Sequence, residues 1–134
     1  MIYKITAPQT LSATIALPSS KSISNRALIL HALSGGNILP DNLSNSDDTE
    51  VIINALKHRP DTIDIKAAGT AMRFMTAYLA TIDGEHVITG TERMKHRPIG
   101  VLVDALINLG ADIEYVGQEG FPPLRIRGQK LTGG

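Results

Sequence analysis

Residues 17–26 read Leu17-Pro-Ser-Ser-Lys-Ser-Ile-Ser-Asn-Arg26, and they connect a segment of alternating apolar and polar residues to an apolar run. The proline and the serines are typical of a turn followed by a helix N-cap, so this stretch predicts a helix that begins near Ser20. We expect the helix to end near Ser34, because two glycines follow it. Residues 27–33 place apolar side chains on most sides of this predicted helix, which predicts that it is buried between layers.

The start of this predicted helix has the chemistry of an anion site. Helix starts carry unpaired N–H groups and the positive end of the helix dipole, and here Lys21 and Arg26 add charge beside several serines. Ser22 and Arg26 are four residues apart, so they share a helix face. One interpretation is therefore a phosphate site. The other is a serine-rich cap with solvated lysine and arginine, and these residues alone do not decide between them.

Composition limits the classes of protein to consider. The chain has 134 residues, the size of one domain, and 13 basic residues balance 13 acidic ones. Neither this balance nor the few aromatic residues favours a nucleic-acid partner, and no apolar run is long enough to span a membrane. There is no cysteine, which excludes disulfides and thiolate metal sites. Without a signal segment, the expected location is the cytoplasm.

Strands and helices alternate along the rest of the chain, which predicts an α/β (α+β) fold. The expected strands are residues 2–6, 11–17, 37–43, 62–66, 85–90, 112–116 and 124–127, and the further helices are 45–57, 69–81 and 98–110. Residues 37–90 and 85–127 look like successive units of two helices on a small sheet. In the second helix, Asp47 and Glu50 have capping-box spacing, and metal binding by Asp47 and Asp48 is the alternative interpretation.

Two later segments carry further candidate anion-binding residues. In residues 67–73, a glycine permits close approach of a ligand, Thr70 is expected to cap the third helix, and Arg73 lies one turn inside it. Residues 91–97 are the densest basic stretch, and in an extended chain Arg93, Lys95 and Arg97 would point the same way. Two strand–turn–helix junctions in one small domain favour a shared site.

Three of these segments resemble, in order, signatures of the EPSP synthase (3-phosphoshikimate 1-carboxyvinyltransferase) family. They are residues 17–27, 68–73 and 93–100, with supporting blocks at 45–48, 102–106 and 122–126. The resemblance covers essentially the whole chain. It implies transfer of the enolpyruvyl group of phosphoenolpyruvate to the 5-hydroxyl of shikimate 3-phosphate, without a metal or organic cofactor, in the shikimate pathway towards chorismate and the aromatic amino acids. Glyphosate inhibits this reaction in the family.

The resemblance also implies an architecture. The family fold has two similar domains, each an inside-out barrel of three βαβαββ units, with the substrates in the cleft between them. Residues 1–17 would be opening strands that belong to, or lead from, the other domain. Residues 18–134 would form about two units of an incomplete N-terminal domain. The expected full-length protein is a monomer, whereas the fragment is expected to be inactive alone and able to self-associate through open sheet edges.

Site residues follow from the resemblance one motif at a time. Lys21, Ser22 and Arg26 match residues that bind shikimate 3-phosphate, and Lys21, Gly69 and Arg93 match residues that bind phosphoenolpyruvate. No residue of this chain matches a catalytic acid or base, and no metal site is implied. The partners are thus two small anions, with no nucleic acid and no membrane.

The chain departs from the family signature at two positions, where Ala67 replaces Asn and Phe74 replaces Pro. We expect the first change to remove a polar contact near phosphoenolpyruvate and the second to alter how the third helix sits, so that glyphosate sensitivity depends on this region. Two other functions stay open at this point. One is a UDP-N-acetylglucosamine 1-carboxyvinyltransferase, which Lys21-Ser22 argues against, and the other is a noncatalytic anion-binding module.

Overall fold

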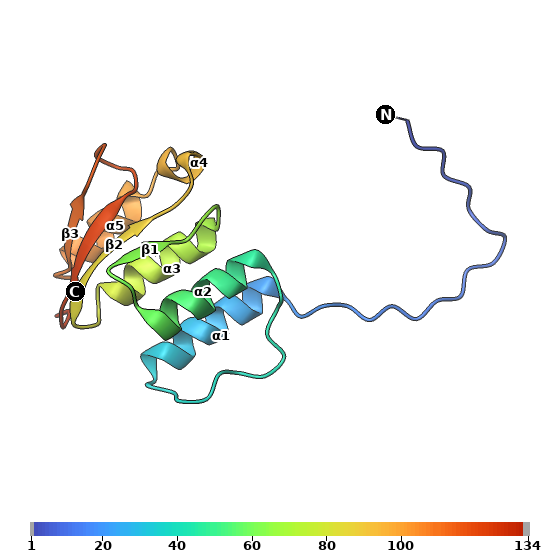
Figure 1. The fold of residues 1–134 in the computed structure, drawn as a ribbon, viewed down its shortest axis with the longest axis horizontal. Helices are drawn as coiled ribbons and strands as arrows, with labels where there is room; N and C mark the ends of the chain where they lie inside the picture. Colours follow the sequence, from blue (N-terminus) through green and yellow to red (C-terminus); the bar gives the residue numbers. More distant parts are fainter. Residues whose placement is uncertain (1, 133–134) are drawn as a thin grey trace.

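The computed structural model describes residues 2–132, as an extended N-terminal segment that leads into a folded body (Figure 1). The helices are α1 (Lys21–Leu33), α2 (Asp47–His58), α3 (Gly69–Leu79), α4 (Glu92–Lys95) and α5 (Gly100–Asn108), and the strands are β1 (Thr62–Asp64), β2 (Gly84–Thr89), β3 (Asp112–Tyr115) and β4 (Leu124–Gly128). Within these described residues, no helix is both long enough and apolar enough to cross a membrane.

The strands form one sheet in the order β1-β2-β4-β3. β1 and β2 are parallel, with Ile63 opposite Ile88, whereas β4 is antiparallel to both of its neighbours. From β1 to β4 the chain therefore follows a β-α-β-α-β-β order, with the short α4 inserted before α5. The expected boundary between two units at residues 85–90 is wrong, because β2 lies in the middle of this single sheet.

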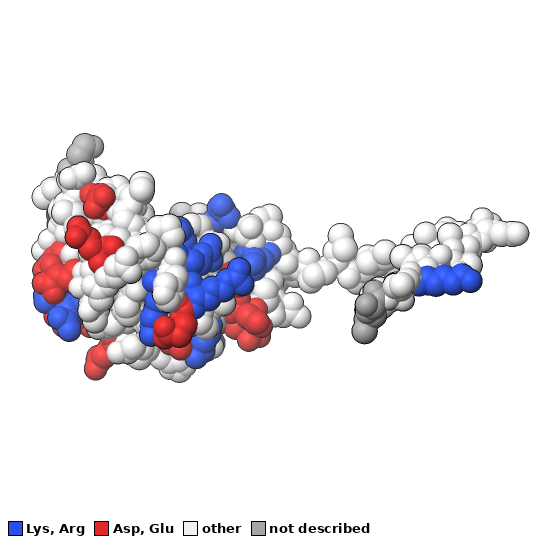
Figure 2. Space-filling model, turned by 90° about the horizontal axis from the view of Figure 1, so that it is seen from above, with Lys and Arg blue, Asp and Glu red and all other residues white. Residues whose placement is uncertain are grey.

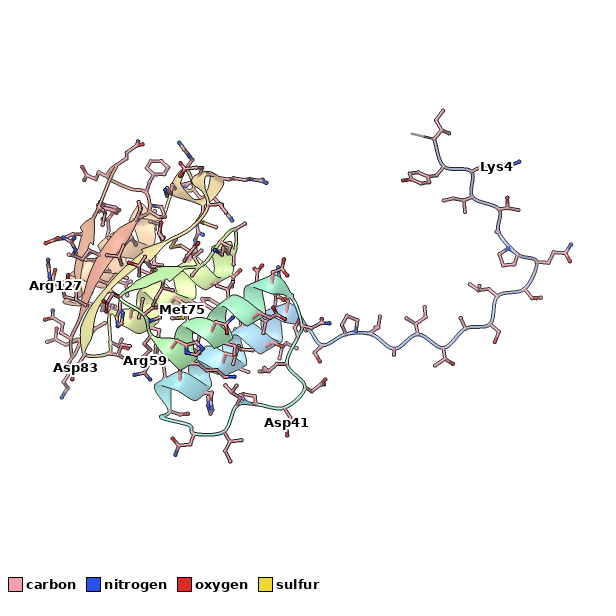
Figure 3. All side chains as sticks on the ribbon, viewed as in Figure 1. Lys4, Asp41, Arg59, Met75, Asp83 and Arg127 are labelled. Atoms are coloured by element: carbon pink, nitrogen blue, oxygen red, sulfur yellow. The ribbon has the colours of Figure 1, made fainter. Side chains whose placement is uncertain are left out.

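One face of the sheet packs against helices and the other carries charge. The inward side chains Ile63, Ile88 and Ile126 are buried, as the alternation along each strand requires. Met75 of α3 fills the space on this side and is 1% exposed (Figure 3). α1 and α2 pack on each other and on α3, so these helices form layers on one side of the sheet.

The predicted helices are present, and their ends follow local chemistry. Ser20 is the N-cap of α1 as expected, and its Oγ accepts a hydrogen bond of 3.4 Å from the N–H of Ile23. Gly35 has a φ of 69° just after α1, which favours glycine. The expected burial of α1 between layers is wrong, since Ile23 is 70% and Leu30 is 67% exposed.

Several expectations about strands and caps are also wrong. Residues 2–6, 11–17 and 37–43 form no strand, because none of them pairs with the sheet within residues 2–132. Ala68, not Thr70, is the N-cap of α3, and no side chain caps it. α2 likewise begins after Ser46 without a side-chain cap, and α5 begins two residues after the proline that was expected to start it.

Candidate anion-binding site

The N-terminal turns of α1 and α3 bring two of the predicted site residues together. Arg26, in the second turn of α1, places its guanidinium over the ring of Phe74, with 5.6 Å between Cζ and the ring centroid. Its Nη1 donates to the carbonyl of Ser22 over 3.0 Å, as the four-residue spacing predicts. Gly69 is the first residue of α3 and lies beside this pair.

We call the space between these groups the cationic hollow. It has a volume of about 330 Å³, and its lining comprises Arg26, Gly69, Thr70, Arg73, Phe74 and Arg97. Three of these six residues are arginines, and none is acidic. Guanidinium groups match phosphate and carboxylate groups in geometry as well as charge. The hollow is therefore suited to an anion.

Arg97 reaches the start of α3 because residue 69 is glycine. A Cβ on Gly69 would overlap the Arg97 guanidinium, so the absence of a side chain lets the charge lie against the helix start. Arg73 also binds at the start of α3. Its Nη1 donates to the carbonyl of Gly69 over 3.2 Å, and its Nη2 donates to the carbonyl of Pro98 over 2.9 Å. These bonds connect α3 to the segment that carries Arg97.

A second hollow of about 400 Å³ adjoins the first through Arg97 and contains Arg93. The expectation that Arg93, Lys95 and Arg97 align on an extended chain is wrong. Residues 92–95 form the short helix α4, whose N-cap Thr91 accepts a hydrogen bond from the N–H of Met94 over 3.4 Å. Lys95 pairs with Glu92 at 2.7 Å, and this hydrogen bond lowers the pKa of Glu92.

The sequence placed Arg97 in a basic stretch but did not assign it to the site beside Gly69. The available signal was its spacing from Arg93, because residues four apart share a face when the chain is helical. Thr91 followed by an acidic residue is also a helix start. In space, Lys and Arg side chains gather on one face of the folded body, with acidic side chains between some of them (Figure 2).

The structure leaves Lys21 and Ser22 outside the two hollows. Lys21 Nζ lies 3.3 Å from Oδ2 of Asp48 in the first turn of α2, and about half of the lysine side chain is exposed. Ser22 contributes its backbone carbonyl to Arg26, but it does not line either hollow. Among residues 2–132, no group of three His, Asp or Glu side chains is arranged to hold a metal ion, Asp47 and Asp48 included.

Fold and site together define an α/β protein in which two helix starts and three arginines surround a candidate anion site. The EPSP synthase (3-phosphoshikimate 1-carboxyvinyltransferase) family model matches the chain over residues 5–60 and 57–134, so the chain belongs to that family. The resemblance stated from the sequence is thereby confirmed, and neither of the two other functions is favoured.

Individual relatives agree with this assignment. The 3-phosphoshikimate 1-carboxyvinyltransferase of Bacteroides fragilis is 64% identical over 99% of this chain, and that of Vibrio cholerae is 42% identical over 94%. The chain covers 32% and 36% of these proteins, so it spans about a third of the length of the curated relatives it matches. An EPSP synthase structure from Acinetobacter baumannii has a TM-score of 0.75 at 22% identity, over 89% of this chain and 33% of that one. This likeness confirms the fold class, with only part of the fold covered.

Proposed function

We propose that this chain is the N-terminal part of an enzyme that transfers the enolpyruvyl group of phosphoenolpyruvate to the 5-hydroxyl of shikimate 3-phosphate. In this reaction the bond between C2 of phosphoenolpyruvate and its phosphate oxygen breaks, and a bond forms between C2 and the 5-oxygen of shikimate 3-phosphate. The 5-hydroxyl loses its proton, and inorganic phosphate is released. The family match over nearly the whole chain carries the proposal. The arginines of the cationic hollow support it, because both substrates are anions with a phosphate and a carboxylate.

Each site residue has a role in this proposal. Arg26 and Ser22 bind shikimate 3-phosphate, and Gly69 and Arg93 bind phosphoenolpyruvate. Lys21 contacts both substrates, which requires it to leave Asp48. That exchange is inexpensive, because ion pairs between exposed side chains contribute only about 0–1 kcal/mol.

We add Arg97 to the residues proposed to bind phosphoenolpyruvate, and its position supports this role. Its guanidinium lies against Gly69 and lines both hollows. An anion in either hollow would therefore meet the same positive charge. Arg73 is less available, because two of its N–H groups already donate to carbonyls.

The proposal assigns binding, not turnover, to this chain. No residue here is assigned as general acid or base, so the chain alone should bind its ligands weakly and be inactive. Residues 1–17 are proposed to belong to, or lead from, the other domain, and residues 18–134 to be part of the N-terminal one. The complete protein is proposed to act as a monomer in the cytoplasm.

A chimera tests this function. Residues 1–134 would replace the matching third of the Bacteroides fragilis relative, and phosphate release from phosphoenolpyruvate would be measured with and without shikimate 3-phosphate. We expect the chimera to be active only with both substrates and the 134-residue chain to be inactive. Arg97→Ala should lower kcat/KM by about 10- to 100-fold, the effect of losing a charged hydrogen bond.

The matched control is Lys57→Ala, which removes an exposed cation of α2 that lines neither hollow. Its activity should equal that of the unsubstituted chimera. A folded chimera that releases no phosphate, or that releases it equally without shikimate 3-phosphate, would refute the proposal.

A further inference from the structure

Arg26 and Phe74 form a wall between two spaces of different character. Both line the cationic hollow, and both also line an apolar groove of about 460 Å³ on the other side. The other residues of the groove include Ile29, Leu30 and Ala77 from α1 and α3. The orientation of Arg26 relative to Phe74 therefore determines whether the guanidinium faces the cationic hollow or the apolar groove.

The stacked ring is a principal contact of the Arg26 guanidinium. Among residues 2–132, no carboxylate lies within ion-pair distance of it, and its one side-chain hydrogen bond goes to the carbonyl of Ser22. A long, exposed arginine held only by that bond would sample many rotamers. A cation–π contact restricts it through the face of the ring and leaves the remaining N–H donors free.

Two adjacent residues of α3, Arg73 and Phe74, contact different sides of the cationic hollow. Arg73 and Phe74 are consecutive, so they leave the helix in directions about 100° apart. Arg73 is directed to Gly69 and Pro98 and thus supports the segment of Arg97, whereas Phe74 is directed to Arg26 on α1. One turn of α3 therefore supports arginines on both sides of the hollow.

We propose that Phe74 is a positioning residue, whose ring holds the Arg26 guanidinium at the wall of the cationic hollow in the orientation that binds an anionic substrate. This inference rests on the proposed function for the identity of the ligand, shikimate 3-phosphate. The ring acts on affinity through Arg26.

The test uses NMR on the 134-residue chain. The Arg26 side-chain resonances should show a ring-current shift, which Phe74→Leu abolishes and Phe74→Tyr preserves. In titrations with shikimate 3-phosphate, Phe74→Leu should weaken binding by about two- to fivefold, as the loss of an exposed cation–π contact implies, and Phe74→Tyr should not. In an Arg26→Ala background, Phe74→Leu should change the affinity no further.

Three results would overturn the inference. They are Arg26 resonances at unshifted positions in the unsubstituted chain, unchanged affinity in a folded Phe74→Leu variant, and an equal loss of affinity in the Arg26→Ala background. If Phe74→Leu does not fold, the first measurement still decides. No binding of shikimate 3-phosphate by the unsubstituted chain would count against the proposed function, and the ring-current shift would then decide the position of Arg26 separately.

Discussion

Gly69 and Gly128 are both crowded, but by different kinds of atoms. A Cβ at Gly69 meets the mobile end of Arg97, whereas a Cβ at Gly128 meets the backbone carbonyls of Ile82 and Leu79. Gly69→Ala should therefore leave the free energy of unfolding nearly unchanged and weaken phosphoenolpyruvate binding, because Arg97 swings away. Gly128→Ala should destabilise by about 1–3 kcal/mol or more. Urea denaturation and NMR titration measure the two effects, and equal destabilisation by both substitutions would contradict this interpretation.

Asn25 is a polar residue of α1 that is buried against α2. It is 1% exposed, and its Oδ1 accepts a hydrogen bond of 2.8 Å from Oγ1 of the buried Thr49. Its Nδ2 has no partner among the described residues. Asn25→Ala should lower the free energy of unfolding by about 1–3 kcal/mol, because the buried Thr49 hydroxyl loses one of its two hydrogen-bond partners and keeps only Ser46 Oγ, at 3.1 Å.

Thr49→Val distinguishes the energy of the Thr49–Asn25 hydrogen bond from that of packing, because valine keeps the shape of threonine and removes the hydroxyl. In the Asn25→Ala background Thr49→Val should cost less stability than in the unsubstituted chain, since the Thr49 hydroxyl has already lost its bond to Asn25. Strictly additive losses in chemical denaturation would show that the hydrogen bond contributes nothing.

At the scale of elements, the four longer helices were predictable because their signals are local, whereas the short α4 was not predicted. Ser20 and the glycines after residue 34 lie next to the helix they limit, and so the predicted and observed ends agree. Strands require a partner that the local pattern does not contain. Residues 11–17 alternate as well as any strand here, yet they pair with nothing in residues 2–132.

Arg73 connects two elements, and its removal should loosen one of them. Arg73→Ala eliminates the bonds to the carbonyls of Gly69 and Pro98. We expect amide hydrogen exchange in residues 91–99 to become faster, while exchange in α2 stays unchanged. Arg73→Lys is the informative partner variant, since an ammonium keeps the charge but cannot span both carbonyls as a fork does. Unchanged exchange at 91–99 in both variants would show that other contacts fix this segment.

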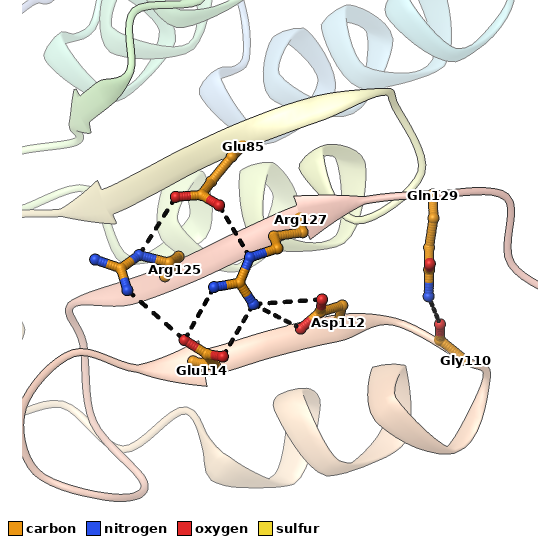
Figure 4. Close-up of polar contacts among 7 residues, drawn as sticks. All are labelled: Glu85, Gly110, Asp112, Glu114, Arg125, Arg127 and Gln129. Atoms are coloured by element: carbon orange, nitrogen blue, oxygen red, sulfur yellow. Dashed lines mark hydrogen bonds and ion pairs between the residues drawn. The ribbon is translucent and has the colours of Figure 1, made fainter.

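The outer face of the sheet carries a ladder of opposite charges across β2, β4 and β3 (Figure 4). Arg127 lies 2.9 Å from Glu85 and 2.9 Å from Glu114, and it also pairs with Asp112 at 3.3 Å. The hydrogen bond from Arg127 lowers the pKa of Glu114 below its ordinary 4.5. A lowered pKa in the folded state means that the pair stabilises the fold above pH 4.5, and that this stability is lost as the pH falls through the lowered pKa.

Denaturation midpoints between pH 7 and pH 3 test this ladder. Arg127→Met should lower the denaturation midpoint at neutral pH. It should also make the midpoint fall less steeply as the pH decreases below about 4.5. The control Lys130→Gln removes an exposed lysine that forms no ion pair in residues 2–132, and it should keep the slope of the unsubstituted chain. If the midpoint of Arg127→Met depends on pH as steeply as that of the unsubstituted chain, the charge ladder is not the cause of the pH dependence.

At the scale of the molecule, the sequence predicted candidate site residues, and the structure brings only some of them together. Arg26 and Gly69 were predicted and lie in one hollow, but their proximity depends on how α1 packs against α3. Arg97 was predicted only as part of a basic stretch. Its place beside Gly69 could not be predicted, because the two residues are 28 positions apart and the segment before Arg97, expected to be extended, forms the short helix α4. Local sequence patterns predict which residues are charged and which cap a helix. Which residues of different elements meet at the site depends on how those elements pack.

The N-terminal segment leaves several apolar side chains exposed to solvent. Residues 2–18 are extended and exposed, and their side chains Ile5, Leu11 and Leu17 are each more than 80% exposed. Ser19 Oγ, which donates to Asn42 over 2.6 Å, begins the contacts with the body. Exposed apolar side chains on an unpaired extended backbone are a template for association between chains.

Removal of residues 1–17 should therefore change association without changing the fold. We expect the full chain to self-associate with rising concentration in sedimentation velocity, and the shortened chain to do so less. The melting temperature at low concentration should be the same for both, because the segment buries little against the body. In the full chain, Ile5→Lys with Ile15→Lys should reproduce the effect of the deletion by placing charge in the same strand pattern. Undiminished association of the shortened chain would instead place the contact at the open edges of β1 and β3, since these are the two outer strands of the sheet.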